Sequence, residues 1–276
     1  MEGAVSRARN KPPRWLVAAR SSGATGGDWL SRALARAGVL PLRQAEEAIA
    51  HGRVTVDARV LREPLAPVTV GQTRVTLDGK PVSLEWRTRV LMLHKPAGVV
   101  THGSRIRGEG TVYDVLVRAM PEGLQGFGWH AVGRLDRDTT GLLLFTNDEK
   151  FVGHATSPET KLPKRYVARV GGEVTPEKLE RLRNGVQIDD GKDTLPAKAR
   201  ARGEEHVELT LTEGRFHQVK RMLNAVNLAT LELHREAVGA LELDVPVEAV
   251  REVTDDEVRE KLHFPSPVGR GSAERG

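Results

Sequence analysis

The sequence predicts an α+β protein in which a small N-terminal domain precedes a larger domain built on a mixed, mainly antiparallel sheet. Three observations lead to this prediction. Apolar residues recur at helical spacing between residues 28 and 52 and then alternate with polar ones, the period of a half-buried strand. The later strands and helices lack the regular alternation that is typical of a doubly wound parallel sheet. The length of 276 residues suits two modest domains.

Four segments follow from the composition along the chain. Residues 1–27 combine five basic side chains with one acidic one and many small residues and prolines, so this segment supplies most of the formal net charge of +5. It holds too few apolar residues to offset the entropy of folding, and we expect a flexible basic arm. We place the small domain over 28–85, the larger domain over 86–262 and a flexible tail over 263–276.

Several classes of protein are excluded by composition. The chain contains no Cys, which excludes a disulfide scaffold, thiol catalysis and Cys-ligated metal centres, and fits a reducing cytoplasm. The longest apolar stretches, such as 141–145, are far shorter than the roughly 20 residues of a membrane helix. The apolar run over 15–19 is too short for a secretory signal. We therefore expect a cytoplasmic protein without a membrane segment.

The small domain begins with two helices. Apolar spacing predicts one helix over 30–37 and a second over 44–51, each followed by a glycine. Alternation then predicts strands over 54–56 and 75–77. Asp78-Gly79 is a strong signal for a tight hairpin turn after the second of these strands. This order predicts two helices followed by a short-stranded sheet.

The larger domain opens with a strand over 86–94, and a loop carrying Lys95 follows it. Capping residues predict helices after Asn147 or Asp148, after Thr175 and after Thr254. The remaining predicted elements are strands over 142–145, 166–170, 207–211 (half-exposed), 231–233 and 241–243, and a helix over 217–226.

Two charged clusters are candidates for chemistry. Residues 134–138 read Arg-Leu-Asp-Arg-Asp, and a carboxylate flanked by arginines stays ionised at neutral pH, as a nucleophile requires. The ordinary alternative is a surface loop held by salt bridges. Residues 215–222 read Arg-Phe-His-Gln-Val-Lys-Arg-Met and open a helix. This cluster is either a solvated basic face or a pair of cations, one directed at a carboxylate and the other at phosphate.

The small domain resembles a known RNA-binding module. The stretches Trp29-Leu-Ser-Arg-Ala-Leu-Ala-Arg-Ala-Gly and Arg43-Gln-Ala-Glu-Glu-Ala-Ile-Ala-His-Gly-Arg-Val resemble the S4 domain, although Pro41-Leu42 departs from the usual small polar pair. The resemblance implies that arginines near the two helices face structured RNA and bridge its phosphates. These arginines are Arg32, Arg36, Arg43 and Arg53.

The larger domain resembles the RsuA-type pseudouridine synthases. The segment Gly133-Arg-Leu-Asp-Arg-Asp-Thr-Thr-Gly is similar to the active-site segment of that family. Three further segments match in the same order, namely His94-Lys-Pro-Ala-Gly, Lys164-Arg-Tyr and Glu213-Gly-Arg-Phe-His-Gln-Val-Lys-Arg-Met. Four motifs in order are far more specific than any one of them.

The resemblance implies a role for each matching side chain. Asp136 is the nucleophile that attacks the target uridine while the glycosidic bond breaks, at either the sugar or the base. Arg134 helps to hold the nucleotide out of the RNA stack, and Tyr166 packs on the base and assists a proton shift. Lys220 pairs with the catalytic carboxylate, and Arg221 is a weaker candidate for that role or for binding RNA. Lys95 either ends a strand together with His94 or is a loop lysine near the RNA.

The resemblance implies an enzyme that isomerises one uridine of ribosomal RNA, free or in a ribosome assembly intermediate. The segments at 217–222 and 233–236 are closer to the small-subunit enzymes of the family than to the large-subunit ones. The chain lacks a His-Glu-x-x-His pattern and a nucleotide-binding glycine loop, so we expect no metal and no cofactor. We also expect a monomer.

Two other functions are compatible with parts of the sequence. One is a ribosome-assembly factor that binds RNA without catalysis, which the presence of Asp136 disfavours. The other is a glycosidase with Asp136 and Asp138 as its carboxylate pair. It is disfavoured because residues two apart on an extended strand point to opposite faces.

Overall fold

The computed structural model describes residues 27–101, 110–157, 159–160 and 162–265. The chain divides between Glu85 and Trp86 into two compact units. Almost all of the predicted basic arm and C-terminal tail lies outside the described residues. Among the described residues, no helix is long and apolar enough to cross a membrane.

The described residues of the N-terminal unit form two helices and two small sheets. The four-stranded sheet follows the helices, as the sequence predicts, whereas β1 before them was not predicted. A four-stranded antiparallel sheet has the order β3-β2-β5-β6, and β1 pairs with β4. Asp78 and Gly79 have positive φ angles of 51° and 76° in the turn between β5 and β6, which confirms the hairpin. The elements are β1 (Gly27–Trp29), α2 (Leu30–Arg36), α3 (Leu42–Ala50), β2 (Val54–Val56), β3 (Arg59–Val60), β4 (Pro67–Thr69), β5 (Val75–Leu77) and β6 (Lys80–Val82).

The apolar positions that predicted these helices form the core of this unit. Leu30 and Leu34 of α2 pack with Ile49 of α3 and with Val54 and Val75 of the sheet, and all five are buried. The second helix starts at Leu42, two residues before its predicted start, because Pro41 supplies the extended residue that precedes the helix. The structure therefore gives this unit its own hydrophobic core.

The larger unit is built on a nine-stranded sheet in the described residues. Its strand order is β11-β12-β10-β13-β9-β7-β15, with β14 on β13 and β8 on β9, and every pairing is antiparallel except that of β13 with β9. The mixed, mainly antiparallel fold is thus confirmed. The elements are β7 (Val90–Lys95), α4 (Val112–Ala119), a 3-10 turn (Glu122–Leu124), β8 (His130–Val132), β9 (Thr140–Thr146), α5 (Glu149–Thr156), β10 (Lys164–Gly171), α6 (Pro176–Asn184), β11 (Lys198–Ala201), β12 (His206–Leu211), α7 (Gln218–Ala225), β13 (Ala229–Val238), β14 (Leu241–Glu242), β15 (Val250–Val253) and α8 (Asp255–Lys261).

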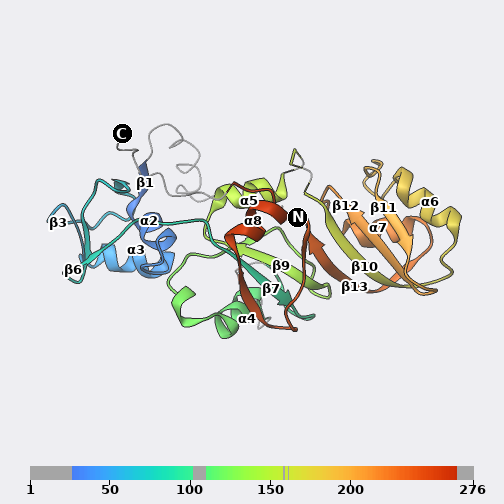
Figure 1. Ribbon diagram of the computed structural model, residues 1–276, viewed down its shortest axis with the longest axis horizontal. Coiled ribbons are helices and arrows are strands. Elements are labelled where there is room, and N and C mark those ends of the chain that lie inside the picture. The colour runs from blue at the N-terminus through green and yellow to red at the C-terminus, as the bar shows by residue number, and fades with distance from the viewer. Residues whose placement is uncertain (1–26, 102–109, 158, 161, 266–276) are drawn as a thin grey trace, which may run out of the picture. The chain divides into compact units, whose positions relative to one another are not determined.

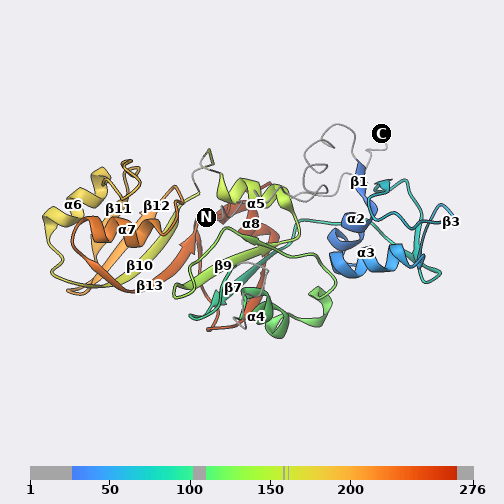
Figure 2. The ribbon, with the colours of Figure 1, turned by 180° about the vertical axis from the view of Figure 1, so that it is seen from behind.

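Helices cover both faces of the sheet around β7 and β9. Val90 and Met92 pack with α5 and α8, whereas the alternate residues Leu91 and Leu93 pack with α4. Figures 1 and 2 show α5 and α8 on one side of these strands and α4 on the other. Burial on both faces explains why these strands read as continuous apolar runs.

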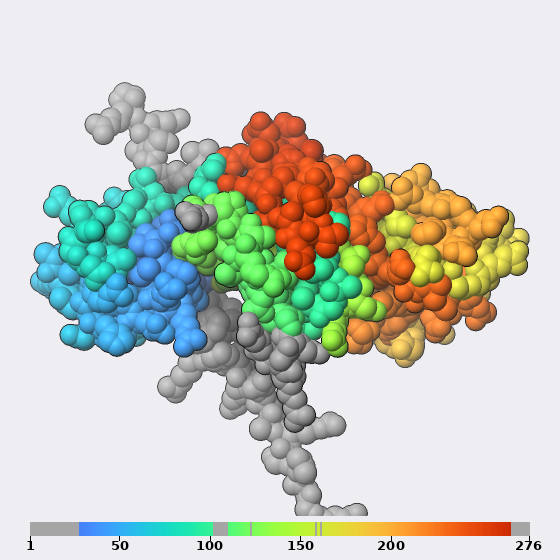
Figure 3. All heavy atoms as spheres, turned by 90° about the horizontal axis from the view of Figure 1, so that it is seen from below, coloured from blue at the N-terminus to red at the C-terminus, as the bar shows by residue number. Residues whose placement is uncertain are grey.

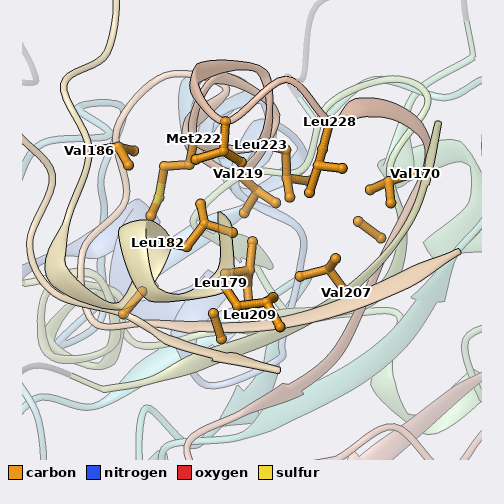
Figure 4. Packing of buried hydrophobic residues seen from close by; sticks show 14 of the residues in the cluster. Val170, Leu179, Leu182, Val186, Val207, Leu209, Val219, Met222, Leu223 and Leu228 are labelled. Carbon is orange, nitrogen blue, oxygen red and sulfur yellow. The ribbon is translucent and has the colours of Figure 1, made fainter. Parts of the chain in front are cut away.

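A second core lies beneath α6 and α7. Leu182 of α6 and Met222 of α7 pack on Val207 and Leu209 of β12, as Figure 4 shows. The prediction that β12 is half-exposed is therefore wrong. Even Glu208 is only 8% exposed, because Arg200 on β11 holds its carboxylate through two bonds of 2.7 Å.

The C-terminal segment closes the other edge of the sheet. β15 pairs with β7, and α8 follows it, beginning with the predicted capping box of Thr254 and Glu257. In Figure 3 this segment, coloured red, lies against the green segments of the same unit. The pairing joins residues 90–93 to residues 250–253 and so ties the end of the unit to its beginning.

We predict that Gly141→Ala destabilises the larger unit by roughly 3 kcal/mol or more. Gly141 has a φ of +108°, and a Cβ there would lie 2.3 Å from the carbonyl oxygen of Arg235 on the adjacent strand. The matched control is Gly153→Ala in α5, where nothing lies within 4 Å and alanine should add about 0.5–1 kcal/mol. Denaturant unfolding of both variants measures the difference, and equal stabilities would contradict the prediction.

Candidate active site

Asp136 lies in the loop between β8 and β9, and neighbouring segments fix that loop. Leu135 is buried, and its backbone exchanges two hydrogen bonds with the Thr101 hydroxyl, which donates to the carbonyl at 2.6 Å and accepts from the amide at 3.1 Å. The Gly98 amide donates to the Arg137 carbonyl at 2.8 Å. The carboxylate of Asp136 therefore projects from a backbone that is held on both sides.

Lys95 is an anchor of the same loop, and its predicted place in a loop near RNA is wrong. It is the last residue of β7 and is fully buried. Its ammonium donates to the carbonyls of Pro96 at 2.9 Å, Arg137 at 3.2 Å and Thr139 at 2.8 Å. Burial lowers the pKa of Lys95 to about 8. We conclude that this side chain supports the Asp136 loop from beneath and does not face an RNA strand.

Two cationic or protonatable side chains of the α7 segment face Asp136. The His217 Nε2 atom lies 3.2 Å from one carboxylate oxygen, and the Lys220 Nζ atom lies 3.5 Å from the other. Lys220 bonds more closely to Asp138, at 2.7 and 2.8 Å, and these bonds lower the pKa of Asp138. The structure thus brings Lys220 to the predicted carboxylate, but as a cation shared between two aspartates.

His217 is the neighbour of Asp136 that the sequence analysis missed. It precedes α7 in the left-handed region, with φ 49° and ψ 32°, and its ring stacks on Phe216 at a centroid distance of 3.7 Å. Phe216 is itself 70% exposed. A histidine at a helix start usually serves local hydrogen bonding, and nothing in the local pattern signals the left-handed turn that directs this ring at Asp136.

Arg221 faces away from Asp136. Its guanidinium bonds to Asp189 and lies 3.3 Å from Asp190, and it also donates to the Phe216 carbonyl at 3.0 Å. The expectation that Arg221 is an alternative partner of Asp136 is therefore wrong. Adjacent helical residues point in different directions, and only Lys220 points at the Asp136 loop.

A cavity of about 460 Å³ opens beside Asp136. Tyr166 on β10 and Arg235 on β13 lie directly opposite each other in the strand register and line it together. Arg134, which is exposed, and His217 line it as well. Asp136, Arg134 and Tyr166 therefore meet at one cavity, as the sequence predicts, although their segments lie far apart in the chain.

Asp138 does not line this cavity, which bears on the alternative of a carboxylate pair. Residues 136–139 form a turn and not a strand, so the argument that Asp136 and Asp138 point to opposite faces of a strand is wrong. Lys220 in fact contacts both aspartates. The outcome is nevertheless the same, since only one of the two carboxylates faces the cavity. Among the described residues, no group of three or more His, Asp or Glu could hold a metal ion.

The four arginines predicted to bind RNA lie in the N-terminal unit in different settings. Arg43 is 90% exposed in its side chain and pairs with Glu47. Arg53 pairs with Asp78 at 2.6 Å, and Arg36 pairs with Asp28 at 2.8 Å. Arg32 is half-buried on α2. The pairs of Arg43 and Arg53 are exposed and therefore weak, so a phosphate can replace their carboxylate partners at little cost. The pair of Arg36 with Asp28 is largely buried.

Comparisons with known proteins agree with both units. Residues 89–225 match the family model described as RNA pseudouridylate synthase, and residues 28–73 match the S4 domain. The chain is 35% identical to ribosomal large subunit pseudouridine synthase B of Bacillus subtilis, over 83% of this chain and 93% of that protein. It is 34% identical to ribosomal small subunit pseudouridine synthase A of Escherichia coli, over 76% of this chain and 89% of that protein.

A solved structure described as a pseudouridylate synthase also has this fold. It matches with a TM-score of 0.58 and 28% identity and covers 85% of this chain and 99% of its own. An S4 domain followed by such a domain defines an RNA-modifying enzyme. The chain belongs to the RNA pseudouridylate synthase family and is a pseudouridine synthase, which confirms the RsuA-type resemblance.

We predict that Lys95→Met lowers the rate of pseudouridine formation by about 100-fold, because an ångström of displacement in a catalytic group can cost that much. The substitution removes the two bonds that hold the Asp136 loop, to the carbonyls of Arg137 and Thr139, together with the bond to the Pro96 carbonyl. Hydrogen exchange at the amides of residues 137–139 should also accelerate. Lys198→Met, at an exposed position of β11, is the control and should change neither quantity. An unchanged rate in Lys95→Met would refute the anchoring role.

Proposed function

We propose that this protein converts a uridine of ribosomal RNA to pseudouridine, with Asp136 as the nucleophile. In this isomerisation the bond from C1′ of the ribose to N1 of uracil breaks, the ring turns, and C1′ bonds to C5 instead. The observation that carries the proposal is the position of the Asp136 carboxylate in a cavity shared with Tyr166 and Arg134. A base must leave its helix before this bond can be reached.

The cavity offers what an extruded nucleotide needs. Tyr166 supplies an aromatic surface for the uracil, and stacking of this kind is worth about 1–3 kcal/mol per base. Arg134 is exposed where it lines the cavity, and it forms no ion pair with a described carboxylate, so its guanidinium is available for the RNA backbone. These two contacts offset the few kcal/mol that extrusion costs.

Two side chains of the α7 segment contact the Asp136 carboxylate. Lys220 lies 3.5 Å from one carboxylate oxygen, and His217 donates toward the other from 3.2 Å when its Nε2 carries a proton. In this proposal the carboxylate acts as the nucleophile, a role that a carboxylate can fill without a metal ion.

We further propose that the substrate is small-subunit ribosomal RNA, free or in an assembly intermediate, and that the enzyme acts on it in the cytoplasm as a monomer. Relatives named for either subunit have nearly the same overall identity to this chain. The segments His217-Gln-Val-Lys-Arg-Met and Leu233-His-Arg-Glu favour the small subunit by their resemblance to those enzymes. Nucleotide-resolution mapping of pseudouridine in both ribosomal RNAs, with and without the gene, tests the choice, and a position lost only from the large-subunit RNA would contradict it.

We predict that Asp136→Asn abolishes isomerisation, by on the order of 10⁴-fold or more, and leaves RNA binding unchanged. The amide keeps the shape of the side chain but loses its charge and nucleophilicity. The matched control is Asp138→Asn, which removes the other partner of Lys220 outside the cavity and should cost less than about tenfold. Single-turnover assays measure both. Retained turnover in Asp136→Asn would refute the nucleophile and favour an RNA-binding factor without catalysis.

We predict that deletion of residues 1–85 weakens RNA binding and makes its dependence on salt shallower. Each phosphate contact that is lost reduces the number of counterions released on binding. A chain that lacks only residues 1–26 is the control, since it keeps the S4 domain and its four arginines. Filter binding over a range of salt concentrations measures both slopes. If the longer deletion behaves like the shorter one, the S4 domain does not contribute phosphate contacts.

A further inference from the structure

Arg235 holds an unused hydrogen-bond donor in the wall of the cavity. The residue lies on β13, is only 4% exposed and lines the cavity beside Asp136. Its Nε atom donates to the Leu142 carbonyl at 2.7 Å, and its Nη1 atom lies 3.5 Å from the Tyr166 hydroxyl. Its Nη2 atom is buried and has no hydrogen-bond partner among the described residues.

Lys164 brings a second cation to the same wall. It lies on β10, two residues before Tyr166, and lines the cavity. Burial and the nearby charge of Arg235 lower the pKa of Lys164 to about 8. Neither Lys164 nor Arg235 forms an ion pair with a carboxylate in the part of the chain that the structure describes. This wall therefore carries positive charge that the protein itself does not neutralise.

This arrangement costs stability, because a buried donor without a partner loses its hydrogen bonds to water and two like charges side by side repel each other. Arg165, next to Lys164 on the same strand, also has a buried Nε atom without a hydrogen bond. Its charge, however, is balanced by Glu236 at 3.3 Å and by Glu242 at 2.7 Å. A ligand that brings electron-rich oxygen to the Lys164–Arg235 wall would remove the cost.

The depth of the wall identifies which part of the nucleotide reaches it. A phosphate in an RNA chain is joined to nucleotides on both sides, so it remains near the mouth of a cavity, where Arg134 is exposed. The base is the free end of an extruded nucleotide and enters deepest. Tyr166, directly opposite Arg235 in the strand register, provides the surface on which that base stacks. The oxygens at the edge of the base are thus the groups that meet Arg235.

We propose, on the basis of the proposed function, that Arg235 is a further catalytic residue, which with Lys164 binds a keto oxygen of the target uracil and stabilises the detached base. When the C1′–N1 bond breaks, its electron pair leaves with the uracil, whose negative charge spreads over N1, O2 and O4, and the Asp136 carboxylate bonds to C1′. After the ring turns, C5 attacks C1′ and the bond from C1′ to Asp136 breaks, which returns its electron pair to the carboxylate. The proton on C5 is then lost and N1 gains a proton. Atoms and electrons balance without a co-reactant.

Arg235→Gln tests this proposal under single-turnover conditions. The removal of one preorganised donor to a developing oxyanion typically costs about 10²–10³-fold in rate, and we expect a loss in that range with RNA affinity unchanged. Arg169→Gln is the matched control, because Arg169 lies on β10 and pairs with Glu232 outside the cavity. It should keep the rate of the unmodified enzyme. Arg235→Lys should recover part of the rate, since it restores the charge but not the planar donor.

Atom substitutions in the RNA show which group Arg235 contacts. Replacement of O2 or O4 of the target uridine by sulfur should slow the unmodified enzyme for the contacted oxygen and have little effect in Arg235→Gln. A phosphorothioate at the 5′ phosphate of the target should slow both enzymes equally. If the phosphorothioate effect, and not the thiouridine effect, disappears in Arg235→Gln, the wall binds phosphate and the proposal is overturned.

The failure of this inference is distinguishable from that of the proposed function. If Asp136→Asn is inactive while Arg235→Gln matches Arg169→Gln within about threefold, the proposed function stands and the role of Arg235 falls. If the enzyme forms no pseudouridine in either ribosomal RNA, both the proposed function and the role of Arg235 are wrong.

Thermal unfolding verifies that Arg235→Gln folds. If Arg235→Gln does not fold, the proposal is tested instead with Lys164→Met and with the unmodified enzyme on the two thiouridine substrates. If the unmodified enzyme converts both thiouridine substrates as fast as uridine, the proposal is overturned.

Discussion

The parallel contact between β9 and β13 is the constraint on which the site depends. Gly141 pairs with Arg235, and the two backbones approach so closely that a Cβ at Gly141 would overlap the Arg235 carbonyl. Because Asp136 lies just before β9, this contact sets its loop beside β13, and the next strand, β10, adds Tyr166. This single close approach therefore brings Asp136, Tyr166 and Arg235 together around one cavity.

The electrostatics of the site separate into two regions. Around Asp136, the positive charge of Lys220 is balanced by the carboxylates of Asp136 and Asp138, and His217 contacts Asp136 as well. At the Lys164–Arg235 wall, the two cations have no such balance among the described residues. The first region contacts carboxylates of the protein itself, whereas the second is suited to bind a negatively charged group of a ligand. The proposed reaction, in which an anionic base detaches from the sugar beside Asp136, would use both.

The sequence predicted the elements whose signals are local. Capping residues gave α6 and α8, the Asp78-Gly79 dipeptide gave the hairpin, and apolar spacing gave α2. It missed α4, although Thr111 and Asp114 form a capping box, because a glycine-rich stretch preceded it. It also missed the short strands β8, β11 and β15, whose existence depends on partners elsewhere in the chain, which single-sequence periodicity does not report.

The difference between local signals and contacts with distant segments also explains which residues of the site were predicted from the sequence. Asp136, Tyr166, Arg134 and Lys220 were found because motifs name them, and the cavity brings the first three together. Lys95 was misplaced because a strand that continues one residue farther turns an exposed loop lysine into a buried anchor. His217 was missed because a left-handed turn directs it at Asp136, and Arg235 because the strand register places it opposite Tyr166. Neither feature can be predicted from the residues next to them in the sequence. Cations without a carboxylate partner can be recognised only when the side chains around them are known in three dimensions, so the Lys164–Arg235 wall could be found only in the structure.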